Sequence, residues 1–97
     1  MRLKDVVGIV TGSGSGIGQA TALRFAEEGA KVVGVDINRA GGEKTLALIK
    51  DKGGECLFVE ADVCKEEDAK RITQETIRVF GKIDALVTNT ARHANHP

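Results

Sequence analysis

Short apolar runs alternate along the chain with segments whose apolar residues recur at helical spacing. Continuous runs rich in Val, Ile and Leu are typical of strands buried on both faces, and they predict strands at residues 6–10, 31–35, 57–59 and 85–88. The intervening segments predict helices at about 16–28, 40–52 and 65–80. Each connection is long enough for a crossover between parallel strands, so the pattern indicates an α/β fold.

Glycines mark where the predicted helices end. Gly29 follows the first helix at the position that commonly adopts a left-handed conformation, and Gly53 and Gly81 follow the second and third. On the third helix, spacing alone assigns the following residues to the packing face: Ala69, Ile72, Thr73, Thr76 and Phe80.

The turn at residues 11–18 carries the clearest chemical signal. It joins the first predicted strand to the first helix and contains Gly12, Gly16 and Gly18 in a G-x-x-x-G-x-G spacing. Glycines allow a tight turn and close approach of a ligand, and the helix N-terminus offers free N–H groups to phosphate. The context predicts a dinucleotide site, in which Ser13 and Ser15 would donate hydrogen bonds to phosphate or ribose oxygens. Serine is also common in turns without a ligand.

An acidic residue follows at the place where a dinucleotide site needs one. Asp36 lies at the end of the second predicted strand, 20 residues beyond Gly16. A carboxylate there can accept the ribose hydroxyls of adenosine and repels a 2′-phosphate, which favours NAD over NADP. Arg39 lies nearby and keeps NADP open as an alternative.

Composition narrows the remaining classes. The 97 residues suit one domain, and 14 basic residues balance 14 acidic ones, which argues against a nucleic-acid or anionic-membrane surface. The apolar runs are too short to span a bilayer, and the N-terminal residues lack the pattern of a secretory signal. We therefore expect a cytoplasmic protein.

Metal and cysteine chemistry find little support in the sequence. Cys56 and Cys64 are too few and too irregularly placed for a disulfide scaffold or a zinc site. His93 and His96 have no third ligand in a recognisable relation to them, so we expect no metal site.

Taken together, several segments resemble the short-chain dehydrogenase/reductase family. They are the glycine turn at 11–18, Asp36, Asp62-Val63 and the segment 86–89, and the resemblance covers residues from about 3 to 89. It implies a Rossmann-type doubly wound parallel sheet of four strands in the order 3-2-1-4 with three helices, incomplete relative to the family. On this basis, residues 1–91 form a partial NAD-binding domain and residues 92–97 an unstructured tail.

The resemblance also assigns a set of cofactor-binding residues. In that family the Asp-Val pair lines the adenine pocket, and an Asn after the fourth strand borders the nicotinamide ribose. Thr88, Thr90 and Ala91 depart from the family's Asn-Asn-Ala-Gly segment around that Asn. The whole set comprises Gly12, Ser13, Ser15, Gly16, Ile17, Gly18, Asp36, Ile37, Asp62, Val63 and Asn89.

The family's catalytic residues do not occur in these residues. Hydride transfer in the family uses a Tyr-x-x-x-Lys pair and a serine, whereas this sequence contains no tyrosine and has serine only at positions 13 and 15. The resemblance implies an NAD(P)-dependent oxidoreductase that acts on an alcohol or ketone. On this interpretation the 97 residues are a truncated chain that carries only the cofactor-binding half of the enzyme. The alternatives are a catalytically inactive nucleotide-binding module and a non-functional truncated product. We also expect self-association through an exposed fourth strand.

Overall fold

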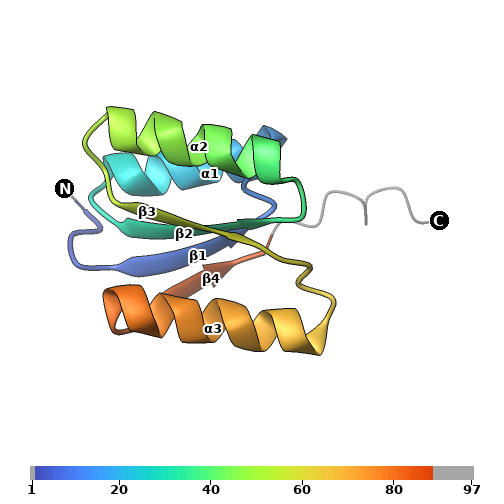
Figure 1. The fold of residues 1–97 in the computed structure, drawn as a ribbon. Coiled ribbons are helices and arrows are strands. Elements are labelled where there is room, and N and C mark those ends of the chain that lie inside the picture. The colour runs from blue at the N-terminus through green and yellow to red at the C-terminus, as the bar shows by residue number, and fades with distance from the viewer. Residues whose placement is uncertain (1, 89–97) are drawn as a thin grey trace.

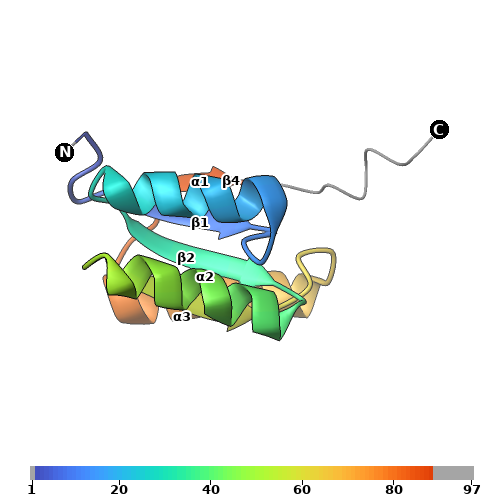
Figure 2. The same ribbon diagram turned by 90° about the horizontal axis from the view of Figure 1, so that it is seen from above.

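The computed structural model of the protein describes residues 2–88 as a parallel sheet between two layers of helices. Figure 1 shows α1 and α2 on one face of the sheet and α3 on the other, and Figure 2 shows the same layers from above. The elements in chain order are β1 (Val7–Thr11), α1 (Gly16–Glu27), β2 (Lys31–Asp36), α2 (Arg39–Asp51), β3 (Cys56–Glu60), α3 (Glu66–Phe80) and β4 (Ala85–Val87).

The strand order is β3-β2-β1-β4, and all three pairings are parallel. The register places Thr11 beside Val35 and Asp36 beside Glu60, so the carboxyl ends of these strands lie together at one end of the sheet. The chain fills one side of β1 with β2 and β3 and then crosses to the other side for β4. This confirms the predicted order 3-2-1-4 and creates a switch point between β1 and β4, where open α/β sheets bind ligands.

Two apolar clusters, one on each face of the sheet, hold the layers together. On one face Ile9 and Val33 pack with Ile72 of α3, and on the other Val10 and Val32 pack with Ile49 of α2. Adjacent residues of the central strands thus serve opposite layers, which explains why β1 and β2 read as continuous apolar runs.

The third helix buries a narrower stripe than its spacing predicted. Ile72 and Thr76 are buried and Phe80 is partly buried, but Ala69 and Thr73 are exposed. The prediction for Ala69 and Thr73 was therefore wrong. Apolar spacing identifies the side of a helix that faces the sheet, but the width of the contact depends on the elements packed beside it.

The predicted domain boundary at residue 91 and the tail at 92–97 lie outside the described residues. Within the described part of the chain, no helix is long and apolar enough to cross a membrane.

Candidate functional site

The glycine turn leaves β1 and passes over the end of β2 before α1 begins. Gly12 and Gly16 adopt left-handed backbone angles, with φ of 71° and 55°, which residues other than glycine rarely adopt. The N–H groups of Gly12 and Ser13 both donate to the carbonyl of Val35, at 2.7 and 3.1 Å. The turn is therefore fixed to β2 by its backbone.

Ser13 is the most buried residue of the turn. Its side chain is fully buried, and its hydroxyl has no hydrogen-bond partner among the described residues. It lies against Gly34, where an added Cβ would be 2.7 Å from the Ser13 Oγ. The hydroxyl is thus packed beneath the turn, and its predicted contact with a phosphate or ribose oxygen stays a prediction.

Thr45 of α2 supports the turn from the helix layer. Its hydroxyl donates to the carbonyl of Ser13 at 2.7 Å and accepts a hydrogen bond from the Gln19 side chain at 3.1 Å. Thr45 thus joins α2, α1 and the turn. Helical spacing alone does not reveal this role, because it cannot show which backbone group the Thr45 hydroxyl meets.

The N-terminus of α1 differs from those of the other two helices. Ser15 occupies the N-cap position without forming a side-chain cap, and the first turn of α1 contains no acidic residue. In α2 the N-cap Asn38 accepts the N–H of Gly41, and α3 begins with acidic residues at 66–68. The first N–H groups of α1 and its positive dipole end are therefore left for an anionic ligand.

Asp36 closes the site at the end of β2. One carboxylate oxygen accepts the N–H of Gly14 at 2.7 Å, and the other accepts the N–H of Asn38 at 2.9 Å. An added Cβ on Gly14 would lie 2.7 Å from this carboxylate, so glycine is needed at that position. Each carboxylate oxygen retains acceptor capacity for a further hydroxyl group.

Arg39, which left NADP open in the sequence analysis, is held by two carboxylates. Its Nε lies 2.7 Å from Oε1 of Glu60, and its Nη1 lies 2.9 Å from Oε2 of Glu43. Both carboxylates raise the pKa of Arg39, with the hydrogen bond to Glu60 as the largest cause. Sequence spacing did not reveal the pair with Glu60, because Arg39 begins α2 whereas Glu60 ends β3.

Asp62 and Val63 follow β3 at the carboxyl end of the sheet, the end that also carries Asp36. The N–H of Ala61 donates to the carbonyl of Asp36 at 3.1 Å, which carries the chain past the end of β2. Asp62 then accepts the N–H of Cys64 at 2.9 Å, and Val63 packs against the core beside α3. Both residues thus follow directly on the contact between Ala61 and Asp36 at the end of β2.

Two large apolar side chains at the carboxyl end of the sheet remain outside the core. Ile17 at the start of α1 is 74% exposed, and Ile37 after β2 is 58% exposed. Both belong to the predicted cofactor-binding set. Asn89, which also belongs to it, lies outside the described residues.

Other candidate chemistry has no centre in the described residues. Residues 2–88 contain no group of three or more metal-ligating side chains. Burial raises the pKa of Cys56 to about 11, so its thiol stays protonated at neutral pH. His93 and His96 lie outside the described residues.

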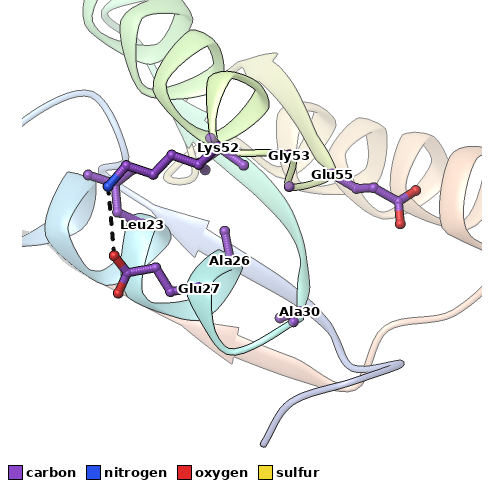
Figure 3. A pocket seen from close by; sticks show the side chains of 10 residues that line it. Leu23, Ala26, Glu27, Ala30, Lys52, Gly53 and Glu55 are labelled. Atoms are coloured by element: carbon purple, nitrogen blue, oxygen red, sulfur yellow. Dashed lines mark ion pairs between the residues drawn. The ribbon is translucent and has the colours of Figure 1, made fainter. Parts of the chain in front are cut away.

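A pocket of about 390 Å³ lies at the end of the sheet where the strands begin, between the last turns of α1 and α2. Figure 3 shows Leu23 and Ala26 beside it and Lys52 directed toward Glu27, with their charged atoms 3.8 Å apart. Because it adjoins the first residues of β2 and β3, this pocket is separate from the glycine turn.

Comparison with known proteins gives consistent matches over almost the whole chain. Residues 6–97 match the model of a family described as short chain dehydrogenase. An uncharacterized oxidoreductase of Thermotoga maritima is 46% identical over 89 residues, which are 92% of this chain and 35% of that protein.

Solved structures agree with the sequence matches. A hydroxysteroid dehydrogenase from Escherichia coli superposes with a TM-score of 0.90 at 34% identity, over 93% of this chain and 38% of that one. A xylitol dehydrogenase with bound NAD⁺ gives a TM-score of 0.85 at 42% identity, over 89% of this chain and 33% of that one. The chain thus spans about a third of the length of these relatives.

Proposed function

The chain belongs to the short-chain dehydrogenase family, and we propose that its glycine turn binds NAD as the cofactor-binding part of an oxidoreductase. The observation that carries this proposal is the first turn of α1. It has neither a side-chain cap nor an acidic residue, and it follows a turn with left-handed glycines at positions 12 and 16. Such a terminus binds phosphate through backbone N–H groups.

The residues around the turn fit the parts of a dinucleotide. Gly12, Gly16 and Gly18 with the Ser15 hydroxyl would hold the pyrophosphate, while Ser13 would position the turn through its backbone. Asp36 would accept the hydroxyl groups of the adenosine ribose. The Asp62-Val63 pair would line the adenine pocket, and the exposed Ile17 and Ile37 would contact apolar surfaces of the cofactor. Asn89 would lie toward the nicotinamide ribose.

Two features support NAD over NADP. The Asp36 carboxylate would repel a 2′-phosphate, and Arg39 is already paired with Glu43 and Glu60. The xylitol dehydrogenase that resembles this chain was solved with NAD⁺, which supports a nicotinamide dinucleotide.

Hydride transfer between a nicotinamide and an alcohol or ketone is the activity that the family implies for the whole protein. When bound, the nicotinamide would supply the hydride chemistry, and the residues named above would bind and orient the dinucleotide. Because the 97 residues contain no tyrosine, the second candidate is a nucleotide-binding module without turnover. An assay for NADH formation from NAD and simple alcohols distinguishes the two, and we expect binding without NADH formation. A cytoplasmic location stays a prediction.

Paired glycine substitutions test the binding proposal. Gly16 and Gly53 both have positive φ, and an added Cβ at either would meet no atom within 4 Å. Gly16→Ala and Gly53→Ala should therefore each cost roughly 1 kcal/mol of stability through backbone strain alone. Only Gly16→Ala should weaken NAD binding in calorimetric titration, by roughly tenfold or more. Equal NAD affinity in both variants and in the wild-type chain would reject the glycine turn as the site.

A further inference from the structure

Glu60 and Arg39 form a charged group beside the predicted adenosine end of the site. Glu60 is the register partner of Asp36 across β2 and β3, so both residues lie at the carboxyl end of the sheet. Arg39 is the first residue of α2, three positions after Asp36. A guanidinium in this place has the charge and the planar set of donors that recognise a phosphate.

The guanidinium is engaged on two sides. Glu60 accepts from its Nε at 2.7 Å and Glu43 accepts from its Nη1 at 2.9 Å. The two carboxylates that contact this guanidinium carry one negative charge more than it neutralises. A 2′-phosphate approaching Asp36 would meet that excess rather than a free cation.

The position of Glu60 is itself fixed. The Arg71 side chain of α3 donates to the backbone carbonyl of Glu60 at 2.8 Å. Arg39, Glu60 and Arg71 line a hollow of about 390 Å³ at the outer edge of β3. The backbone that carries Glu60 is therefore fastened to α3, while its side chain holds Arg39.

Resting on the proposed function, we propose that Glu60 is a specificity-determining residue that excludes 2′-phosphorylated dinucleotides by holding Arg39. Asp36 repels the 2′-phosphate directly. Glu60 acts through Arg39, because it occupies the guanidinium that would otherwise compensate the phosphate charge.

The group is suited to substitution because its members are exposed. The Arg39 and Glu60 side chains are 62% and 44% exposed, and exposed ion pairs contribute little to stability. Glu60→Gln keeps the size of the side chain and removes its charge. A thermal melt followed by circular dichroism verifies that each variant folds.

The experiment is calorimetric titration of the full 97-residue chain with NAD and with NADP at low salt. Glu60→Gln should strengthen NADP binding by roughly fivefold and change NAD binding by less than about twofold. Adding Arg39→Met to Glu60→Gln should abolish the gain, since the released cation is then absent. Glu27→Gln is the matched control, because it removes one negative charge at the other end of the strands, where β2 and β3 begin and Glu27 faces Lys52 (Figure 3).

The outcomes separate this inference from the proposed function. Unchanged NADP affinity in Glu60→Gln, a gain that survives Arg39→Met, or an equal gain in Glu27→Gln overturns the inference, while NAD binding by the wild-type chain leaves the proposed function standing. A wild-type chain that binds neither nucleotide overturns both.

Discussion

At the scale of single residues, the two serines of the glycine turn have opposite environments. Ser13 is fully buried, and its hydroxyl has no hydrogen-bond partner within residues 2–88. Ser15 is exposed at the N-cap of α1 and forms no side-chain cap. Their positions in the sequence gave them equal standing as phosphate ligands. From these surroundings we infer that Ser13 supports the turn and that Ser15 is the better candidate for a contact with the ligand.

Alanine at each serine tests this division. Ser13→Ala removes an unsatisfied buried hydroxyl, so we expect a gain of about 1 kcal/mol in the free energy of unfolding and unchanged NAD affinity. Ser15→Ala should leave stability unchanged and weaken NAD binding by roughly tenfold to a hundredfold, the value of one hydrogen bond to a charged group. Urea denaturation and calorimetric titration measure the two effects. Loss of NAD affinity in Ser13→Ala would mean that its hydroxyl turns toward the ligand.

The sequence predicted single residues best where the backbone dictates the residue type. Gly12 and Gly16 do adopt the left-handed angles that a tight turn requires, and Asp36 does end β2 beside the turn. The pairing of Arg39 with Glu60 could not be read in the same way. It depends on the register between β2 and β3 and on the direction of the Arg39 side chain, and many charged residues on the surface have several possible partners.

At the scale of elements, β4 joins the sheet through a side chain as well as through its ladder. Asp84 precedes β4, and its carboxylate accepts the N–H of Val7 at 2.8 Å while its own N–H donates to the carbonyl of Val7 at 2.9 Å. Lys82 lies 3.1 Å from the same carboxylate oxygen. The Val7 hydrogen bond, followed by Lys82, lowers the pKa of Asp84 below its ordinary value of 3.8.

This link should make the attachment of β4 sensitive to acid. Because the pKa of Asp84 is lower in the folded than in the unfolded state, its contribution to stability is complete above about pH 4 and is lost as the pH falls through the folded value. Wild type should therefore melt at a higher temperature than Asp84→Asn at pH 6, and the two melting temperatures should converge toward pH 2. Asp51→Asn, at the exposed end of α2, is the control. A constant difference between wild type and Asp84→Asn at all pH values would contradict the role of ionisation.

The existence and order of the elements were predictable because strand and helix periods alternate without interruption. The bounds agree to within one or two residues, and the order 3-2-1-4 is confirmed. The exposure of Ala69 and Thr73 shows the limit of this reasoning. Period reveals which side of α3 is apolar, but neighbouring elements decide how much of that side is covered.

At the scale of the whole molecule, the two edges of the described sheet differ in character. The β3 edge carries charge, since Glu60 is bound by Arg39 and Arg71 contacts its carbonyl. The β4 edge is three residues long and exposes 62% of Leu86. Charged side chains discourage edge-to-edge pairing, whereas exposed apolar strands promote it.

We therefore expect the 97-residue chain to self-associate through β4 as its concentration rises. Sedimentation velocity from about 10 to 200 μM should show a growing fraction of dimers or larger species, since exposed strand edges drive association in this range. Leu86→Glu should return the chain to monomers, because a charge on the strand opposes pairing with another copy. Ala47→Glu, which adds the same charge on the exposed side of α2, should leave association unchanged. If the wild-type chain stays monomeric throughout, or if both variants reduce association equally, β4 is not the surface that joins the copies.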